Sequence, residues 1–227
     1  MAKRLFDIFI ALLALSVLSP LIVLCAIGIK LSSSGPILYR AVRVGQDGQK
    51  FSMLKLRTMR IESDHASAIT APGDSRVFGF GKFIRMMKMD ELPQFWNILV
   101  GDMSVVGPRP EAADIVDSAY TDWMHETLKV RPGVTSPGAI YNYLMSDTLI
   151  NPEDPERSYA ERMLPPKLAL ELAYIQRASF AKDFGYVALT SWAVIANALG
   201  LRARLPAVDV EGARKWAPQG PYPNART

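Results

Sequence analysis

Apolar positions divide the chain into a hydrophobic N-terminal run and a longer region of mixed character. Residues 8–29 contain no charged side chain. A straight helix of this length spans roughly 33 Å, close to the hydrocarbon thickness of a bilayer. A cleaved signal peptide is disfavoured, because the run is too long and Lys30 stands where a cleavage region would be. A membrane-spanning helix and a re-entrant helix, which enters and leaves on one face, both remain open.

Two features favour the re-entrant helix. Ser19-Pro20 lies at the middle of the run, where proline removes a backbone donor and is expected to break the helix. The Ser19 hydroxyl is suited to bond a carbonyl that the break sets free. Two basic residues precede the run and Lys30 follows it, and basic flanks prefer the cytoplasmic side. We therefore predict a re-entrant membrane helix over residues 1–32, broken at Ser19-Pro20.

The rest of the chain changes between strand-like and helical patterns. Alternating residues on either side of Asp47-Gly48 predict a β-hairpin over residues 37–57, whose excess of basic residues suits an anionic membrane surface. Helical spacing of apolar residues predicts helices over 83–99 and from Lys167 onward. The stretch 184–199 suits either packing on the domain or an interfacial helix.

The predicted fold class is α+β, mainly helical, in a monotopic membrane protein with a re-entrant helix, a small β-hairpin and interfacial amphipathic helices. We expect the membrane helix over 1–32 and a domain lying on the membrane over 33–200. The acidic, proline-containing stretch 145–166 is predicted to be a surface excursion. Residues 201–227 are predicted to be a mobile or loosely attached tail, because proline, glycine, arginine and small residues dominate them.

Composition narrows the classes of protein that this chain can represent. Of its 227 residues, 49% are hydrophobic and 21% are charged, which excludes a disordered chain. A single long apolar run excludes a polytopic transporter. The net charge of +4 suits an anionic partner without choosing among nucleic acid, phospholipid and phosphorylated substrate. With Cys25 as the only cysteine and two histidines, an intrachain disulfide is excluded and a zinc site of Cys and His is disfavoured.

Asp90 and Glu91 are the candidate catalytic pair. Pro93 fits the first turn of a helix, so one interpretation makes Asp90 an ordinary N-cap. In the other, Asp90 is exposed at a helix N-terminus whose N–H groups favour phosphate. A carboxylate at that point can attack phosphorus, and a neighbouring carboxylate can hold a metal or handle a proton. Both interpretations stay open on these residues alone.

Arg109 is the candidate phosphate ligand. Pro108 and Pro110 restrict the backbone on either side of it and so fix the direction of its side chain. A guanidinium held in this way suits bidentate phosphate binding. The alternative is an ordinary turn with a surface arginine. A second Pro-Gly turn follows Arg131.

The order of short motifs carries a family resemblance. They are Lys55-Leu-Arg-Thr-Met-Arg60, Gly81-Lys-Phe-Ile-Arg85, Asp90-Glu-Leu-Pro-Gln94, Gly101-Asp-Met-Ser104, Val106-Gly-Pro-Arg-Pro110 and Arg131-Pro-Gly-Val-Thr135. The series closely resembles the bacterial sugar transferase family, the small monotopic phosphoglycosyl transferases. The resemblance extends over residues 3–196, and the motifs are specific only when taken together.

The resemblance implies a definite reaction. Members of this family move a phospho-sugar from a UDP-sugar to polyprenyl (undecaprenyl) phosphate, at the cytoplasmic face of the bacterial inner membrane, and so begin glycoconjugate assembly. By likeness, Asp90 is the nucleophile, which forms a covalent phospho-sugar intermediate, and also the ligand of the Mg²⁺ that the family requires. Glu91 is its partner for proton handling or metal placement. The expected substrate-binding residues are Arg85, Arg109, Pro108, Lys55, Arg57 and Arg131. A homodimer stays open, and no nucleic-acid partner is expected.

Two departures from the family pattern stand out. Where the family commonly has Arg-Pro-Gly-Ile-Thr-Gly, this chain reads Thr135-Ser136-Pro137-Gly138, and Glu171 stands where the family often carries Asp. Two rival functions also stay open. An anchored nucleic-acid binder lacks interleaved aromatic residues and a recognisable motif, and a non-enzymatic membrane-surface binding protein has no use for Asp90-Glu91. The sequence does not reveal which sugar is transferred.

Overall fold

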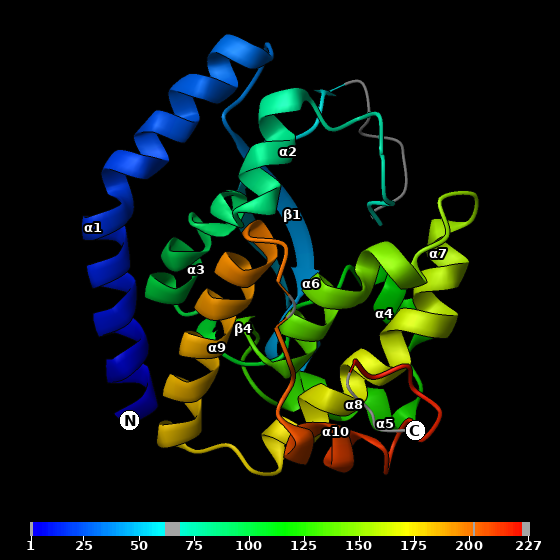
Figure 1. Cartoon of the computed structure of the whole chain (residues 1–227). Helices are drawn as coiled ribbons and strands as arrows, with labels where there is room; N and C mark the ends of the chain where they lie inside the picture. The colour runs from blue at the N-terminus through cyan, green and yellow to red at the C-terminus, as the bar shows by residue number, and fades with distance from the viewer. Residues whose placement is uncertain (1, 62–68, 202, 224–227) are drawn as a thin grey trace.

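The computed structural model describes residues 2–61, 69–201 and 203–223, which form a mainly helical α+β protein with two small sheets (Figure 1). The α-helices are α1 (Ala2–Ser32), α2 (Gly79–Met86), α3 (Gln94–Val100), α4 (Ala113–Ala119), α5 (Asp122–His125), α6 (Pro137–Leu149), α7 (Pro155–Ser158), α8 (Leu164–Ile175), α9 (Phe180–Ala198) and α10 (Ala207–Ala213). The strands are β1 (Leu38–Val44), β2 (Lys50–Leu56), β3 (Ser104–Val106) and β4 (Gly133–Thr135). The short helical elements are the 3₁₀ helices η1 (Gln46–Gly48), η3 (Met89–Glu91) and η4 (Glu126–Lys129), and the π-helix η5 (Tyr159–Met163). The predicted mainly helical α+β class, with one long apolar N-terminal helix, is confirmed.

The N-terminal helix α1 is continuous and bends near its middle (Figure 1). Pro20 lies inside it, and the Ser19 hydroxyl donates to the Ser16 carbonyl at 3.0 Å. That carbonyl is the one that loses its usual partner, because proline at position 20 has no N–H. The predicted break is therefore a bend within an unbroken helix, and the expected compensation by Ser19 is present.

Both halves of α1 pack against the same domain. Near its start, Asp7 is buried and accepts hydrogen bonds from the Ser104 hydroxyl at 2.9 Å and the Val105 N–H at 3.0 Å. Near its end, Cys25 and Ile29 are buried in a cluster with side chains of β2 and α2. Only 11% of its most apolar stretch is buried, and it is the one helix among the described residues long and apolar enough to cross a membrane.

The strands β1 and β2 confirm the predicted hairpin. They pair antiparallel, from Leu38 opposite Leu56 to Val44 opposite Lys50. Asp47 in the connecting turn has a φ of 55°, in the left-handed region that aspartate tolerates better than most residues. The Asp-Gly signal therefore located the turn correctly.

Asn97 fastens α3 to this hairpin. Its side-chain oxygen accepts the Leu54 N–H at 2.9 Å, and its side-chain nitrogen donates to the Ser52 carbonyl at 2.8 Å. Two such bonds from one buried amide hold the strand edge and the helix in a fixed relation. Because η3 comes just before α3, this arrangement also sets the position of Asp90 over β2.

The second sheet brings two motifs together that lie about 25 residues apart in the sequence. The strands β3 and β4 pair in parallel, the Gly107 N–H donates to the Thr135 carbonyl at 3.0 Å, and the Gly133 N–H donates to the Pro108 carbonyl at 2.9 Å. The two backbones approach so closely that a Cβ on Gly133 would lie 2.1 Å from the Gly107 nitrogen. Glycine is therefore required where the Gly-Pro-Arg-Pro and Arg-Pro-Gly segments meet.

The helix α8 lies at the centre of the domain. Ten of its residues are buried, and α6 and α10 pack against it. The stretch 145–166, predicted to be a surface excursion, instead forms the end of α6, α7 and η5, and it places Tyr159 and Met163 in the core. The acidic residues of that stretch face solvent, while apolar residues between them face α8. Composition alone could not show that the two kinds of residue lie on opposite faces.

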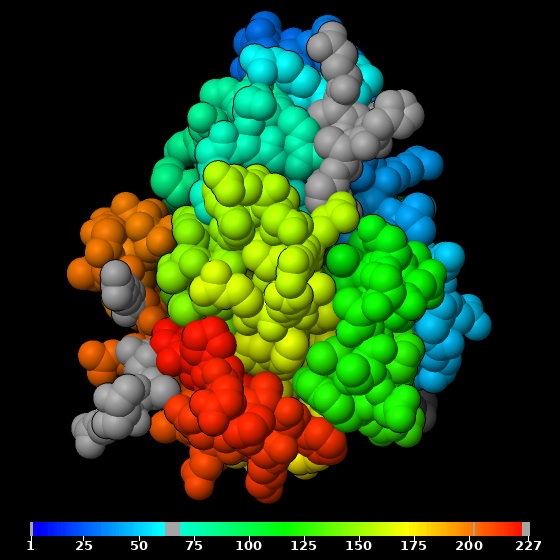
Figure 2. Space-filling view, turned by 90° about the vertical axis from the view of Figure 1, so that its right-hand side faces the viewer, coloured from blue at the N-terminus to red at the C-terminus, as the bar shows by residue number. Residues whose placement is uncertain are grey.

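The C-terminal segment is part of the core, so the prediction of a loosely attached tail is wrong for residues 203–223. Figure 2 shows this segment, in red, packed beside the yellow and green helices. Val210 and Tyr222 are buried, and the buried carboxylate of Asp209 accepts hydrogen bonds from Arg177 at 2.5 Å and from the Tyr186 hydroxyl at 2.6 Å. Its small residues are needed for this packing, because Gly212 lies directly against Ala173 of α8.

Candidate active site

A cleft of about 590 Å³ opens between η3, the hairpin, α6 and the segment after β3. Its charged lining residues include Lys55, Arg85, Lys88, Asp90, Glu91 and Arg109. These residues come from β2, α2, η3 and the loop after β3, so the fold collects them from four motifs of the sequence. The cleft is large enough for a nucleotide-sized ligand.

Local backbone geometry presents the acidic pair to this cleft. Lys88 has a φ of 55° in the left-handed region, which turns the chain sharply between α2 and η3. Asp90 and Glu91 follow in the 3₁₀ turn, and α3 begins only at Gln94. Asp90 makes no capping hydrogen bond and is four residues from the helix start, so the N-cap interpretation is wrong. The pair lies on a tight turn before the helix.

Glu91 is held by cations from three elements. The Arg109 guanidinium bonds both of its carboxylate oxygens, at 3.1 and 2.5 Å, and the Lys55 ammonium bonds it at 3.3 Å. Lys88 lies 3.9 Å away. Burial opposes ionisation of this carboxyl, yet the three cations hold the pKa of Glu91 well below its usual value. Glu91 is thus favoured in its charged form and anchors Arg109.

Asp90 is buried and has a free oxygen. It is 7% exposed, and its Oδ1 atom has no hydrogen-bond partner among the described residues. Burial raises the pKa of Asp90 and the nearby Lys55 opposes that rise. A buried carboxylate oxygen without a partner is costly, which makes Asp90 the candidate to meet a ligand or a reacting atom in this cleft.

Two further predicted residues complete the cationic rim. Burial lowers the pKa of Lys55 to about 8 although Glu91 opposes that change. Arg85 projects from α2 and donates to the Thr58 and Thr70 hydroxyls at 3.3 and 2.8 Å. Both of these hydrogen-bond partners are neutral hydroxyls, and Arg85 lines the cleft, so its guanidinium suits an anionic ligand there.

Arg57 does not line the cleft. It is buried, and it donates to the Pro36 carbonyl at 2.6 Å, to the Ser33 hydroxyl and carbonyl at 2.8 Å, and to the Met59 carbonyl at 3.2 Å. All of its donor nitrogens are engaged in joining the end of α1 to the hairpin. The geometry therefore favours a structural role over the predicted substrate contact.

Arg131 and Pro108 lie in a different cavity. This second space, of about 450 Å³, is lined by Ser104 and Val106 of β3 and also by Lys3 and Lys129. Of the Gly-Pro-Arg-Pro motif, Arg109 and Pro110 line the main cleft, whereas Gly107 and Pro108 line the second cavity. Pro108 can therefore affect the cleft only through the backbone direction of Arg109.

A buried charge cluster at the cleft escaped the sequence reasoning. Lys167 forms an ion pair with Glu111 and bonds the Tyr159 hydroxyl at 2.9 Å, and that hydroxyl donates to Glu111 at 2.6 Å. Lys167 is only 1% exposed. Burial alone would raise the pKa of Glu111, but the charge of Lys167 opposes this rise, and the pKa is below its usual value. No spacing linked these three residues, since they come from three distant segments.

Comparison with known proteins places the chain in a family. A family model described as bacterial sugar transferase matches residues 1–197. The chain belongs to the bacterial sugar transferase family. The match ends before α10, so the packed C-terminal segment lies outside the part that the family shares.

Relatives of this bacterial sugar transferase carry related names. A UDP-glucose:undecaprenyl-phosphate glucose-1-phosphate transferase of Xanthomonas campestris is 36% identical over 199 residues, which cover 86% of this chain and 39% of that protein. A protein of the same name from Caulobacter vibrioides is 35% identical over 83% of this chain and 67% of its own length. A UDP-N-acetylgalactosamine-undecaprenyl-phosphate N-acetylgalactosaminephosphotransferase of Aeromonas hydrophila is 42% identical over 59% of this chain and 32% of its own length. The chain thus spans well under half of two of these three relatives.

Proposed function

We propose that this protein transfers a phospho-sugar from a UDP-sugar to polyprenyl phosphate, giving polyprenyl diphosphate sugar and UMP, as the first membrane step of glycoconjugate assembly. The names of the relatives supply the substrate classes. The observation that carries the proposal is the unpartnered, buried Asp90 oxygen beside the Glu91–Arg109 pair in a cationic cleft.

The proposed reaction has two displacements at one phosphorus. An Asp90 carboxylate oxygen attacks the phosphorus that bears the sugar, the bond from that phosphorus to the bridging oxygen breaks, and UMP leaves with that oxygen. A phosphate oxygen of the lipid then attacks the same phosphorus, and the Asp90 carboxylate is released. Two acceptors used in turn favour such a covalent intermediate.

The residues around Asp90 address the main obstacle, which is repulsion between an anionic nucleophile and an anionic diphosphate. Arg85, Lys88 and Lys55 bring positive charge to the cleft, where low dielectric strengthens their effect. Glu91 bonds both terminal nitrogens of Arg109 and so holds this guanidinium in place at the cleft. A planar guanidinium so aimed suits phosphate oxygens.

The site also fits the Mg²⁺ that the family requires. Among the described residues no group of three or more His, Cys, Asp or Glu side chains could enclose a metal. Mg²⁺ is usually held by one or two carboxylates together with substrate phosphates, and Asp90 offers one free carboxylate oxygen for that purpose. When bound, the ion would neutralise charge that develops on the diphosphate.

The shape of α1 supports monotopic attachment, which we propose to be at the cytoplasmic face of the inner membrane. At 1.5 Å per residue its 31 residues extend over roughly 46 Å, yet Asp7 near one end and Ile29 near the other are buried against one domain. A straight spanning helix would separate its ends by the whole bilayer. The bend at Pro20 instead allows both ends to stay with the domain while the middle enters the lipid.

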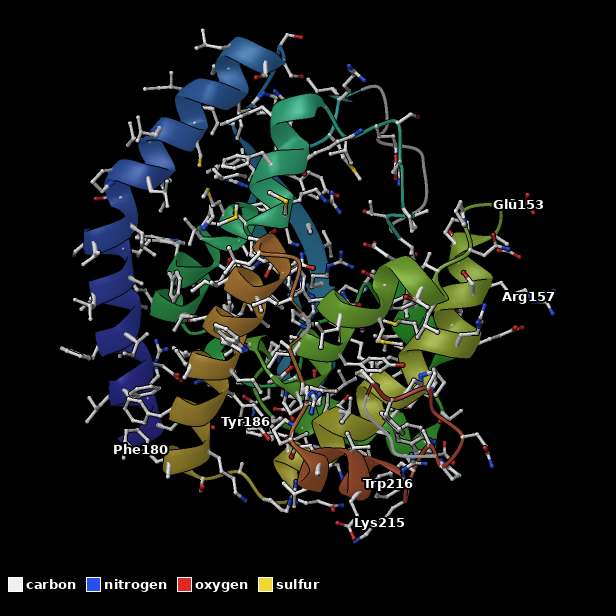
Figure 3. The ribbon with its side chains drawn as sticks, in the orientation of Figure 1. Glu153, Arg157, Phe180, Tyr186, Lys215 and Trp216 are labelled. Carbon is white, nitrogen blue, oxygen red and sulfur yellow. The ribbon has the colours of Figure 1, made fainter. Side chains whose placement is uncertain are left out.

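A second helix adds to the surface proposed to meet the membrane. Phe180 and Phe184 of α9 contact the ring of Phe6 in α1, and Figure 3 shows Phe180 beside the lower end of α1. Further along α9, Trp192 and Ile195 are half exposed. Apolar and aromatic side chains on two adjacent helices suit a membrane interface.

Turnover assays test the reaction. A panel of UDP-sugars is incubated with undecaprenyl phosphate, Mg²⁺ and purified protein, and UMP release is measured. We expect release with at least one sugar, and its loss in Asp90→Asn but not in Asp117→Asn, which makes the same chemical change on an exposed face. Release that is unchanged in Asp90→Asn would reject Asp90 as the nucleophile, and no release with any sugar would favour a non-enzymatic surface-binding role.

The covalent step and the anchor need separate tests. Mass spectrometry of protein mixed with donor alone should find a phospho-sugar on the peptide that contains Asp90. For the anchor, Ala2→Cys and Ser34→Cys are made singly in a Cys25→Ser background and labelled in sealed vesicles. Labelling of both from the cytoplasmic side supports the re-entrant helix, whereas labelling from opposite sides would establish a spanning one.

A further inference from the structure

Glu171, on the central helix α8, contacts the backbone of the loop that carries Arg109. It is fully buried, and its Oε1 atom accepts the Arg109 N–H at 3.0 Å. The same oxygen accepts the Ser136 hydroxyl at 2.7 Å. Glu171 does not line the cleft, so it has no direct contact with a ligand there and acts only through the residues that it holds.

The surroundings of this carboxylate are built around it. Ser136 caps α6 by accepting the Ala139 N–H at 2.9 Å while it donates to Glu171. Gly138 leaves the necessary space, since a Cβ at that position would lie 2.4 Å from Glu171 Oε1. Ser136 and Gly138 are therefore both in direct contact with Glu171, and the three residues form one arrangement.

A second contact from the same helix holds the other end of the loop. Lys167, one turn before Glu171, forms the buried ion pair with Glu111, which directly follows Pro110. The contacts at positions 109 and 111 hold the segment on both sides of Pro110. The Arg109 guanidinium in turn bonds Glu91, which is next to Asp90. A shift of α8 would therefore move Arg109 relative to the proposed nucleophile.

We propose that Glu171 is a positioning residue, which together with Ser136 sets the Arg109 loop so that its guanidinium meets Glu91 at the reacting centre. This inference rests on the proposed transferase function. Misplacing a catalytic cation by about 1 Å can cost on the order of 100-fold in rate, so a buried contact to the Arg109 backbone is enough to matter.

Ionisation of Glu171 is costly in the folded protein. Burial raises its pKa to about 7, and its Oε2 atom is buried without a hydrogen-bond partner among the described residues. The ionisable groups that face it are Lys167 and Tyr174 of α8, Arg109, Tyr120 at the end of α4 and Tyr186 of α9. An apolar or amide side chain would avoid this cost, which makes a purely space-filling role a poor explanation.

A double-mutant cycle tests the positioning role. Glu171→Asp shortens the carboxylate and Ser136→Gly removes its second donor. We expect each single variant to lower kcat about 10-fold with less than a threefold change in the KM for UDP-sugar, and the double variant to recover part of that loss because the two residues act as a unit. Asp209→Asn, a buried acid in a separate network, should lower the melting temperature but leave kcat per folded protein unchanged.

Additive losses in the cycle, or single variants that melt earlier while keeping wild-type kcat, would overturn the proposal. An NMR measurement that needs no substrate separates this inference from the transferase assignment. In protein labelled with ¹⁵N-arginine, the Arg109 amide resonance should move with pH with a midpoint near 7, as the acceptor ionises. The resonance should not move in Glu171→Gln, and an identical titration in that variant would show that Glu171 does not control this loop.

Discussion

The clearest quantitative prediction concerns the stability cost of Glu171. Its pKa in the folded protein is about 7, raised by burial from an ordinary value of 4.5. Below the ordinary value, both the folded and the unfolded chain hold the proton, and this group does not affect stability. Between the two values only the unfolded chain loses its proton, so the free energy of unfolding falls as pH rises. Above pH 7 the loss is complete.

The size of the effect follows from the difference in proton affinity. Since a tenfold change in affinity is worth about 1.4 kcal/mol, the full loss at alkaline pH is about 3 kcal/mol. For a protein of this length, that corresponds to roughly 6–12 °C in melting temperature. Glu171→Gln removes the ionisation, so the melting temperature of this variant relative to wild type should rise by that amount between pH 4.5 and pH 8.

Melting of both proteins in the same lipid nanodiscs across this pH range measures the difference. Effects of the substitution that do not depend on pH, such as altered hydrogen bonds to Ser136, change the melting temperature equally at pH 4.5 and pH 8. They therefore cancel when the two differences from wild type are compared. A difference between Glu171→Gln and wild type that is the same at pH 4.5 and pH 8 would refute the reasoning.

Three further predictions follow from the packing. Deleting residues 202–227 should expose a face of α8 and leave little soluble folded protein on size-exclusion chromatography, because burying Val210 and Tyr222 alone contributes roughly 3–6 kcal/mol; a monodisperse truncated protein would contradict this. Arg57→Ala should lower the free energy of unfolding by at least about 2 kcal/mol, through its lost bonds to carbonyls, while the KM for UDP-sugar in the folded fraction stays unchanged; a raised KM at wild-type stability would restore the substrate contact. Gly138→Ala should reduce UMP release at least 10-fold by pushing Glu171 aside, and wild-type release would show that the carboxylate can move freely.

Much of the fold was readable from local sequence. Alternation around Asp47-Gly48 located the hairpin, and Pro20 located the bend of α1, because both signals act through backbone conformation within a few residues. The helical period gave the helices that follow Lys167. What failed was the C-terminal segment, whose small residues suggested a mobile tail although they are what allows α10 to pack closely on α8.

For the site, the sequence by itself determined which chemical groups are present: an acidic pair at residues 90 and 91, an arginine between two prolines, and basic residues in neighbouring motifs. Only the tertiary structure decided which of them share one cleft. It brought Lys55, Arg85 and Arg109 to the acidic pair, directed Arg57 into the structure and put Arg131 in a second cavity. The reason is that contacts between segments far apart in the chain decide which groups an arginine bonds and which cavity it lines. Such contacts leave no local pattern in the sequence.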